Sequence, residues 1–330
     1  ILSYKEENCI GDCVESLINQ TISLDEFEVL IINNCSYEEE FDNTENIVKE
    51  KLHKYKYDNI HLINVKFQIK DNITYDLKNL EKFHDVLLIS TNEIKKKINV
   101  PVIPSKNPRL DFQRVAMEFF ADDEFKPGIH NTAVVEENAI IGKNVFVGAH
   151  CYIGKNTKIG NNTKILPNTC IFGKTTIGSN SVIKSNVTIG SEGFSFSFTG
   201  DGFFHFPSLG SIVIGKNVWI GSNCTVEKSQ IDQTIIEDHV KIDDLVHVGH
   251  NSTIKRSTQI AAGVVISGRV KVGKGCWLAP NSVIDNGCEI GDDCLVGTSS
   301  LVRSNFPENS VIVGSPAKFL KKTYKNTNGK

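Results

Sequence analysis

Long apolar segments and a strong charge of either sign are both missing from this sequence. No run of 18 or more apolar residues occurs among its 330 residues, so no segment is long enough for a transmembrane helix. A basic stretch followed by an apolar one, as in a secretory signal, is missing too. The net charge is −3 and the one basic cluster is the tail 318–330, which argues against a nucleic-acid partner. We therefore expect a cytoplasmic chain without a transmembrane segment.

Cysteine pairs of the metal-binding or redox kind are missing as well. The nine cysteines are dispersed and none belongs to a CxxC motif, so neither zinc nor thioredoxin-like chemistry is indicated. Without a secretory signal, this cysteine usage fits a reducing compartment. The length predicts about two domains, and the start at Ile1 instead of Met is expected if the natural chain begins further upstream.

From residue 129 onward, an aliphatic residue recurs at every sixth position, with two interruptions. The position after it is often glycine, and the position four after it is small. Cysteines in this small position are expected to be interior residues and not reactive thiols; they are Cys151, Cys224, Cys276, Cys288 and Cys294. The 26 aliphatic positions are Ile129, Val135, Ile141, Val147, Ile153, Ile159, Ile165, Ile171, Ile177, Ile183, Ile189, Ile214, Ile220, Val226, Ile236, Ile242, Val248, Ile254, Ile260, Ile266, Val272, Leu278, Ile284, Ile290, Val296 and Val302.

A period of six fits neither an α-helix nor a simple alternating strand. It fits a coil of triangular cross-section, in which each six-residue unit supplies one short strand and one corner. Three units, or 18 residues, complete a turn, so residues 18 apart lie above one another. Aliphatic side chains then stack inside, while glycine and asparagine occupy the corners. The sequence predicts a mainly β fold: a parallel β-helix with a small N-terminal α/β domain.

The repeat resembles that of the hexapeptide-repeat acyltransferases over residues 129–318. The segment Gly314-Ser315-Pro316-Ala317-Lys318 also resembles the end of many sugar acetyltransferases. This resemblance implies a left-handed β-helix and a homotrimer. It is less specific for activity, because γ-class carbonic anhydrases use the same repeat.

The first interruption of the repeat lies between Ile189 and Ile214, where 25 residues replace the expected 24. Six phenylalanines fall within 194–206, and no six-residue unit can hold them inside the coil. We expect a loop or hairpin that packs on the flank of the coil, forms an apolar wall for an acyl chain or a base, or does both. The second interruption lies between Val226 and Ile236, where ten residues replace twelve.

The segment 189–251 resembles the UDP-3-O-acylglucosamine N-acyltransferases of lipid A biosynthesis. The shared motifs are the Ile-Gly-Ser-Glu-Gly-Phe loop at 189–194, the Asp-x-Thr-Ile-Ile break at 232–236 and the pair His250-Asn251. Upstream, the Asn-Pro-Arg-Leu-Asp-Phe segment at 107–112 resembles their junction between nucleotide-binding domain and coil. The resemblance implies transfer of an acyl group from acyl carrier protein or coenzyme A, as co-substrate, to the amine of a UDP-linked amino sugar.

N-acylation by a thioester requires a base for the amine and donors for the oxyanion, and histidine suits the first task. His250 lies at a corner with its side chain outward, and the resemblance implies that it is the general base. Gly268 lies 18 residues further, so its N–H is expected beside His250, and the resemblance implies that it binds the oxyanion. Asp243 or Asp244 is expected to orient His250 or to bind a sugar hydroxyl. The remaining substrate-binding residues expected from the motifs are His247, Asn251, Ser191, Glu192, Gly193 and Phe194.

Other interpretations stay open. His239, His247 and His250 lie close in sequence, as in a metal site, but they occupy different positions of the repeat, and we expect no metal and no bound cofactor. The turn at 284–288 lacks the second histidine of the N-acyltransferases, and their long C-terminal helix has no counterpart after Lys318. Both departures favour an acetyl-CoA-dependent sugar-nucleotide N-acetyltransferase as one alternative. A non-catalytic β-helical scaffold is the other.

Residues 1–65 resemble the start of a family-2 glycosyltransferase, with an apolar strand at 29–32. No D-x-D metal motif follows, so we expect an α/β fragment that either binds a nucleotide or packs on the coil. Residues 66–126, with an apolar strand at 85–90, resemble part of the uridine-binding domain of the N-acyltransferases. The predicted coil then occupies 127–318 with a loop at 191–213, followed by a polar tail at 319–330.

Overall fold

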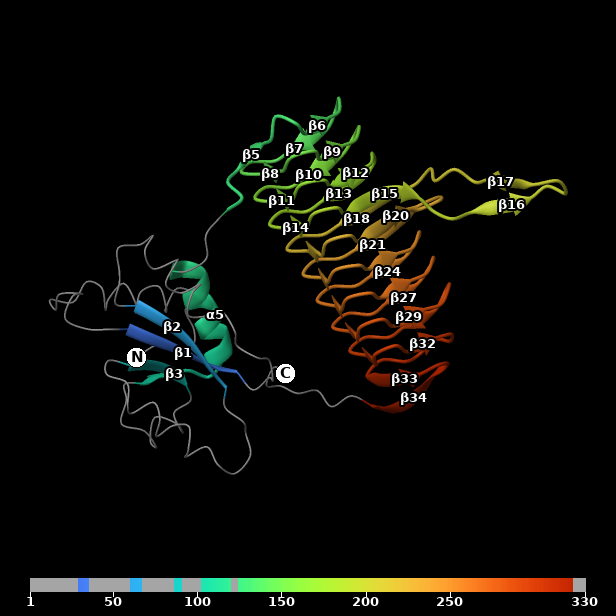
Figure 1. Ribbon diagram of the computed structural model, residues 1–330. Helices are drawn as coiled ribbons and strands as arrows, with labels where there is room; N and C mark the ends of the chain where they lie inside the picture. The colour runs from blue at the N-terminus through green and yellow to red at the C-terminus, as the bar shows by residue number, and fades with distance from the viewer. Residues whose placement is uncertain (1–28, 36–59, 67–85, 91–101, 120–123, 323–330) are drawn as a thin grey trace. The chain divides into compact units, whose positions relative to one another are not determined.

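The computed structural model contains two compact units, one within residues 1–123 and the other within 124–330 (Figure 1). The residues that the structure describes are 29–35, 60–66, 86–90, 102–119 and 124–322.

The first unit contains a four-stranded sheet in which every pairing is parallel. Its order is β2-β1-β3-β4, and its strands are β1 (Val29–Cys35), β2 (Ile60–Lys66), β3 (Val86–Ser90) and β4 (Val102–Pro104). The two apolar segments of the sequence form β1 and β3. One sheet therefore unites strands from the predicted segments 1–65 and 66–126, and the boundary between these segments stays a prediction.

Helix α5 (Pro108–Phe119) follows β4 and begins within the Asn-Pro-Arg-Leu-Asp-Phe motif. Asn107 caps it, because its Oδ1 atom accepts the N–H of Leu110 at 3.2 Å. Phe112 and Val115 are buried, so the helix has one apolar face. The helix has only 12 residues, and none in the described ranges is long and apolar enough to cross a bilayer.

The second unit is a parallel β-helix, in which the chain passes in turn through three faces, as the period of six predicts (Figure 1). Face 1 contains β5 (Gly128–Ile129), β8 (Phe146–Val147), β11 (Lys164–Ile165), β14 (Val182–Ile183), β19 (Trp219–Ile220), β22 (Lys241–Ile242), β25 (Gln259–Ile260), β28 (Trp277–Leu278), β31 (Leu295–Val296), β33 (Ser310–Gly314) and β34 (Ala317–Lys322). Face 2 contains β6 (Val134–Val135), β9 (Tyr152–Ile153), β12 (Cys170–Ile171), β15 (Thr188–Glu192), β20 (Thr225–Lys228), β23 (His247–Val248), β26 (Val265–Ile266), β29 (Val283–Ile284) and β32 (Leu301–Val302). Face 3 contains β7 (Ile140–Ile141), β10 (Lys158–Ile159), β13 (Thr175–Ile177), β18 (Ser211–Ile214), β21 (Gln233–Ile236), β24 (Thr253–Ile254), β27 (Lys271–Val272) and β30 (Glu289–Ile290). We call the corner between faces 1 and 2 the first corner, that between faces 2 and 3 the second, and that between faces 3 and 1 the third.

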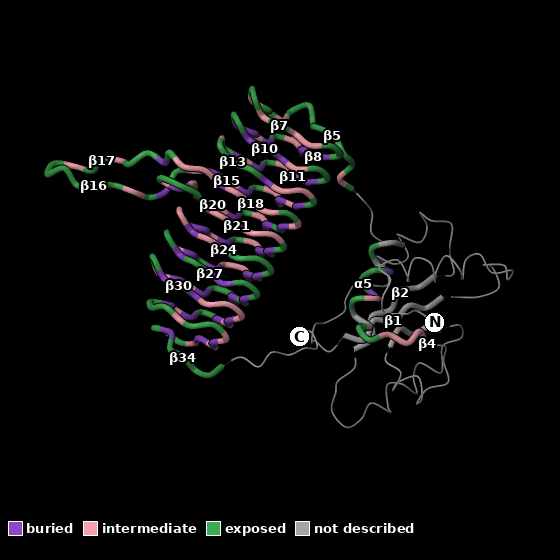
Figure 2. The backbone as a smooth tube through the Cα atoms, turned by 180° about the vertical axis from the view of Figure 1, so that it is seen from behind, coloured by how far each residue is buried: buried purple, intermediate pink, exposed green. Residues whose placement is uncertain are grey.

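The core is the stack of aliphatic residues inside the coil. Most are the second residue of a two-residue strand, and the buried residues form one cluster along the coil (Figure 2). Pairs such as Ile242 and Ile260 lie in register on neighbouring coils, and both are nearly fully buried. Ile129 and Val135 of the first coil remain exposed. Hydrophobic burial therefore stabilises the coil along its whole length, because each coil covers the aliphatic side chains of the one before it.

Asparagine and glycine occupy the corners for different reasons. Asn162 and Asn180 stack on the third corner with φ of 57° and 59°, a left-handed conformation that asparagine tolerates better than most residues. Their side chains form a ladder, in which Nδ2 of Asn162 donates to Oδ1 of Asn180 at 3.1 Å. Gly221 is needed for space instead, since a Cβ atom there would lie 2.3 Å from the carbonyl carbon of Asp243 in the next coil. Where glycine follows the aliphatic residue it therefore permits close stacking, and asparagine supplies the turn.

Small polar residues line the interior beside the aliphatic column. The buried Ser252 hydroxyl donates to the carbonyl of Ser267 at 3.0 Å, and the Cys224 thiol donates to the carbonyl of Asp243 at 3.1 Å. The five cysteines in this position are all buried and free, which confirms that they are interior residues. Burial raises the pKa of the Cys224 thiol to about 11, so it is not a reactive thiolate.

The first interruption forms a hairpin that leaves the coil between β15 and β18. Its strands are β16 (Phe196–Phe198) and β17 (Phe203–His205), which pair antiparallel. All six phenylalanines are exposed, from 39% for Phe206 to 87% for Phe194, and the hairpin extends away from the coil (Figure 2). The expectation that these rings pack on the flank of the coil is therefore wrong within the described chain, because the hairpin projects from it.

Candidate functional site

His250 lies on the second corner, directly after β23. Gly249 continues the strand into the turn, and Asn251 completes the turn with a left-handed φ of 61°. This conformation directs the His250 side chain outward, as its position in the repeat predicts, and leaves it partly exposed. The imidazole is therefore accessible and held on a rigid coil.

Two glycines hold the His250 ring between them. A Cβ atom on Gly268 would lie 2.7 Å from Nε2, and a Cβ atom on Gly193 would lie 2.9 Å from Cδ2. Neither glycine has a left-handed backbone, so the absence of a side chain is what these positions require. Gly268 lies in the next coil, whereas Gly193 comes from the base of the hairpin. The structure thus brings three of the residues expected in the site together.

Asn251 fixes the orientation of the ring. Its Oδ1 atom lies 3.0 Å from Nδ1 of His250 and also accepts the N–H of Gln230 at 3.2 Å. Its Nδ2 atom donates to the carbonyl of Ile231 at 2.7 Å, which settles which end of the amide carries the oxygen. Since Oδ1 can only accept, Nδ1 of His250 carries the proton, and in the neutral ring Nε2 carries the free lone pair. The atom beside Gly268 is therefore the basic one.

The second interruption explains why Asn251 can act in this way. Only four residues, 229–232, separate β20 from β21, and this short connection forms the second corner of the coil that precedes His250. Asn251 binds it through Gln230 and Ile231, and the N–H of Asn251 donates to Oγ1 of Thr234 at 2.9 Å. The short connection at 229–232, which replaces part of the repeat, thus supports the turn that carries His250.

Gly268 presents a free amide at the site. Within the described chain, no acceptor binds its N–H, although its carbonyl accepts the N–H of Gly287 at 3.0 Å. A residue with an unpaired N–H beside a basic nitrogen can supply a donor to an oxyanion that forms near that base.

Glu227 is a site residue that the sequence did not predict. Its Oε2 atom accepts the N–H of His250 at 3.1 Å, and its Oε1 atom lies 3.9 Å from Nε2 of His247. Only 14% of its side chain is exposed. Nδ1 of His247 in turn lies 2.7 Å from Oγ1 of Thr225. The only signal in the sequence was an acidic residue at the second interruption, in a position of the repeat that glycine often fills.

Three more of the residues expected in the site, Ser191, Glu192 and Phe194, lie at the base of the hairpin. Ser191 pairs with Glu227 across a register shift between β15 and β20, so the backbone of this loop borders the site. Glu192 turns to the hairpin, where its Oε2 atom lies 3.2 Å from Nδ1 of His205. Phe194 is exposed, and its ring meets that of Phe196 edge-on at 5.1 Å. Of the loop residues 191–194, Gly193 is the one whose added Cβ would meet the His250 ring.

Asp243 and Asp244 lie on the first corner, at the other edge of face 2. Asp244 forms an ion pair with Lys184 at 2.8 Å and accepts the N–H of Ser222 at 2.7 Å. The hydrogen bond from Lys184 lowers the pKa of Asp244, with the Ser222 N–H acting in the same direction. Asp243 accepts the N–H of Asp244 at 2.8 Å. The partner of the His250 ring is thus Asn251 and neither aspartate, and a role of the aspartates in sugar binding stays a prediction.

The three histidines considered as metal ligands do not gather at one point. His239 lies on the third corner, His247 on face 2 and His250 on the second corner. Among the described residues, no group of three or more His, Cys, Asp or Glu side chains is placed to hold a metal ion.

Family models match both parts of the chain. The bacterial transferase hexapeptide model matches residues 156–191, 233–268 and 269–304, and the hexapeptide repeat of succinyl-transferase matches 138–172 and 211–243. The model of glycosyl transferase family 2 matches residues 1–68. Both resemblances expected from the sequence are confirmed.

Among curated proteins, the chain is similar to the UDP-3-O-acylglucosamine N-acyltransferases. The protein from Delftia acidovorans is 28% identical over 128 residues, which cover 39% of this chain and 38% of the relative. The protein from Hahella chejuensis is 35% identical over 125 residues, which cover 38% of this chain and 36% of the relative. The match therefore spans little more than a third of these relatives.

Solved structures share the coil. The UDP-N-acetylglucosamine acyltransferase of Francisella novicida superposes with a TM-score of 0.54 at 26% identity, covering 59% of this chain and 70% of that one. LpxA from Acinetobacter baumannii gives a TM-score of 0.55 at 25% identity, covering 59% and 74%. The second unit is thus a left-handed β-helix of bacterial transferase hexapeptide repeats, similar to the acyltransferases of UDP-linked amino sugars, as its motifs predicted.

Proposed function

We propose that this chain transfers an acyl group from a thioester to the amine of a UDP-linked amino sugar, as in the synthesis of lipid A or a related surface glycan. The observation that carries the proposal is the His250 ring, whose Nδ1–H donates to Asn251 while Nε2 stays free beside Gly268, a residue whose N–H has no acceptor in the described chain. A base and an oxyanion donor side by side are what acyl transfer to an amine requires. The similarity to N-acyltransferases of UDP-linked sugars supports the choice of substrate.

In the proposed reaction, Nε2 of His250 takes a proton as the amine nitrogen attacks the thioester carbonyl carbon. The new C–N bond forms, and the carbonyl oxygen becomes an oxyanion that accepts the Gly268 N–H. Collapse of this intermediate breaks the C–S bond, and the thiolate of coenzyme A or acyl carrier protein leaves and takes up a proton. Glu227 and Asn251 hold the His250 turn during these steps, because one binds its main-chain N–H and the other its ring.

Our proposal includes a homotrimer. The first residue of each face 2 strand is neither lysine, arginine nor a carboxylate, although β15 and β20 extend to Glu192, Glu227 and Lys228. A row with so little charge is typical of a surface that contacts another subunit. Its members are Val134, Tyr152, Cys170, Thr188, Thr225, His247, Val265, Val283 and Leu301. Association through this face would place His250 at the edge of a subunit interface.

The site does not define the length of the acyl group or its carrier. The test therefore includes both donors predicted from the sequence, coenzyme A and acyl carrier protein. The purified chain is incubated with UDP-linked amino sugars and, separately, with acetyl-CoA, longer acyl-CoA thioesters and acyl carrier protein thioesters. We expect thiol release only when both substrates are present, and a product whose mass rises by one acyl group. An amide resists mild alkali, whereas an ester is cleaved, so the product also shows which group was acylated. No release with any pair would contradict the proposal and favour the scaffold alternative.

A further inference from the structure

Arg269 directly follows Gly268 on the second corner. Its main-chain N–H donates to the carbonyl of His250 at 2.8 Å, and its φ of 59° is left-handed. In the coils before and after it, the same position of the turn holds Asn251 and Gly287, residue types that this conformation favours. The turn itself therefore does not require an arginine. A residue of this kind held in a left-handed conformation beside a reacting centre points to a functional role.

The Arg269 side chain reaches across the turn that carries His250. Its Nη2 atom donates to Oε1 of Gln230 at 3.3 Å. Gln230 lies one coil before His250, whereas Arg269 lies one coil after it. The main-chain N–H of Gln230 in turn donates to Oδ1 of Asn251, the atom that accepts from the imidazole. One segment thus holds both the ring and the guanidinium at the same level of the coil.

The guanidinium of Arg269 has no counter-charge in the part of the chain that the structure describes. Gln230 supplies a neutral oxygen, and none of the described carboxylates forms an ion pair with Arg269. Arg303, two coils further on the same corner, is paired instead, since its Nε atom lies 3.4 Å from Oδ2 of Asp285. Arg269 is exposed, and a Cβ atom on Gly287 in the next coil would have no atom within 4 Å. Most of its N–H donors are therefore open to a ligand.

The proposed acceptor carries negative charge close to its reacting nitrogen. In a UDP-linked 2-amino sugar, the amine and the glycosidic phosphate are attached to neighbouring ring carbons. When the amine nitrogen lies at Nε2 of His250, this phosphate is consequently no further from the imidazole than the length of one side chain. A guanidinium suits such a group, because it binds phosphate oxygens through paired hydrogen bonds and stays charged at neutral pH.

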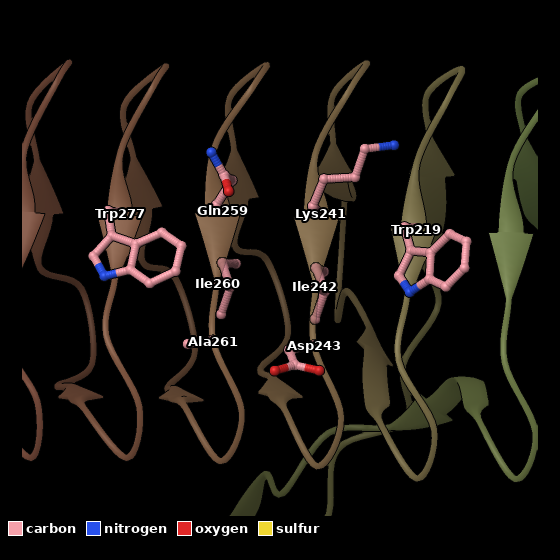
Figure 3. A pocket seen from close by; sticks show the side chains of 8 residues that line it. All are labelled: Trp219, Lys241, Ile242, Asp243, Gln259, Ile260, Ala261 and Trp277. Carbon is pink, nitrogen blue, oxygen red and sulfur yellow. The ribbon is translucent and has the colours of Figure 1, made fainter. Parts of the chain in front are cut away.

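Lys241 is a cation in the same coil as His250, but its position is different. It lies on face 1 in a shallow groove of about 240 Å³, between Trp219 and Trp277 (Figure 3). Its Nζ atom donates to the carbonyl of Asn217 at 2.6 Å, and burial lowers its pKa. The first corner and face 2 separate it from His250 within the chain. A phosphate whose neighbouring amine lies at Nε2 therefore cannot contact this lysine of the same chain.

We infer that Arg269 binds the glycosidic phosphate of the UDP-linked amino sugar and thereby places the acceptor amine at Nε2 of His250. Gln230 is a positioning residue in this arrangement, because its neutral oxygen holds the guanidinium without cancelling the charge. This inference rests on the proposed function and deepens it by assigning a residue to the acceptor and not to the thioester.

Binding of the UDP-linked amino sugar to the full chain, measured by calorimetry, tests the assignment without turnover. Arg269→Asn removes the guanidinium and supplies a residue that tolerates the left-handed φ. We expect Kd to rise at least about tenfold, as for the loss of charge-assisted hydrogen bonds. Arg269→Lys keeps the charge but not the paired donors, so its Kd should lie between the two.

Arg303→Asn is the matched control, because it removes a paired arginine from the same corner. It should bind the UDP-linked amino sugar as the wild type does. A folded Arg269→Asn variant that binds as tightly as the wild type, or an equal loss in Arg303→Asn, would overturn the assignment. A wild-type chain that does not bind this ligand would contradict the proposed function and the assignment with it.

Gln230→Glu distinguishes phosphate binding from a merely structural role of Arg269. The new carboxylate pairs with the guanidinium, so the connection 229–232 should be at least as stable in denaturant unfolding as in the wild type. The same carboxylate competes with phosphate for the N–H donors, so Kd for the UDP-linked amino sugar should rise several-fold. A Gln230→Glu variant with unchanged affinity would show that the guanidinium does not contact the ligand.

Shortened ligands identify the group that Arg269 binds. An amino sugar 1-phosphate keeps the glycosidic phosphate without uridine, and the free amino sugar lacks both. As inhibitors of turnover, the 1-phosphate should lose at least about tenfold in affinity in Arg269→Asn, whereas the free sugar should lose none. The KM for the thioester should stay within about twofold of the wild type. A raised thioester KM with an unchanged acceptor KM would assign Arg269 to the donor and overturn the inference.

Discussion

Oδ1 of Asn251 accepts the Nδ1–H of His250 at 3.0 Å, while Nδ2 of the same amide donates to the carbonyl of Ile231 at 2.7 Å. The two contacts tie the tautomer of the imidazole to the short connection between β20 and β21. The basic nitrogen consequently lies beside Gly268 of the next coil. The geometry of one amide thus assigns the base atom of the proposed reaction.

Replacement of this amide by a carboxylate tests that assignment. Asn251→Asp keeps an oxygen near Nδ1 and tolerates the left-handed φ of 61°, but it loses the donor to Ile231 and adds a negative charge beside the ring. We expect the acid limb of the kcat/KM profile to move to higher pH, because the charge holds the ring protonated further up the pH scale. An unchanged profile in a folded variant would mean that Asn251 does not contact the catalytic base.

Gly268→Ala tests the close approach of the next coil. The added Cβ atom would lie 2.7 Å from Nε2 of His250, so the ring or the strand must move. We expect kcat/KM to fall by at least about tenfold, as for a displaced base or oxyanion donor. Gly202→Ala on the hairpin is the matched control, since no atom lies within 4 Å of its added Cβ. Equal activity of both variants would argue against this placement of the site.

Glu227 is expected to support the His250 turn through its hydrogen bond to the main chain. Glu227→Ala leaves the N–H of His250 without its acceptor, which should cost about 1–3 kcal/mol in the free energy of unfolding and lower kcat. Glu227→Gln retains an acceptor oxygen and should restore most of the stability. Denaturant unfolding and initial rates measure both effects. A Glu227→Ala variant as stable and active as the wild type would remove this residue from the account.

The ion pair on the first corner predicts a pH-dependent stability. The pKa of Asp244 is lowered by the hydrogen bond from Lys184, so its stabilising contribution is complete above the ordinary value of 3.8 and is lost as the pH falls through the lowered one. Asp244→Asn should therefore reduce the free energy of unfolding at pH 7 by about 0.5–1 kcal/mol, with a difference that shrinks in acid. Glu289→Gln, in a more exposed pair with Lys271, should have the smaller effect. An Asp244→Asn difference that grows toward low pH would contradict this reasoning.

The sequence predicts the coil and the pairing of His250 with Gly268 for the same physical reason. Both residues lie after the two interruptions, where one turn takes 18 residues, so residue spacing alone places one above the other. The burial of the five cysteines follows in the same way from their position in the repeat.

The parts of the site that depend on the interruptions could not be predicted from spacing. Across the first interruption Ile177 pairs with Ile214, and across the second Ile214 pairs with Ile236, so neither step is a multiple of 18. Glu227 therefore reaches the N–H of His250 although 23 residues separate them. Asp243 and Asp244 lie one corner before His250 in the same coil, so the regular repeat already separates them from the ring, whose partner is Asn251. The sequence predicts the loop or hairpin, but not which surface its phenylalanines contact, because composition does not specify what an apolar loop packs against.

The initial rate of the His250→Ala variant tests the central claim most directly. Alanine removes the imidazole and leaves the stacked core untouched, so the variant should keep the wild-type fold and mass. If Nε2 takes the proton of the attacking amine, kcat should fall by at least about 100-fold with saturating thioester and UDP-linked amino sugar. A folded His250→Ala variant that turns over within twofold of the wild type would show that the reaction does not use this histidine.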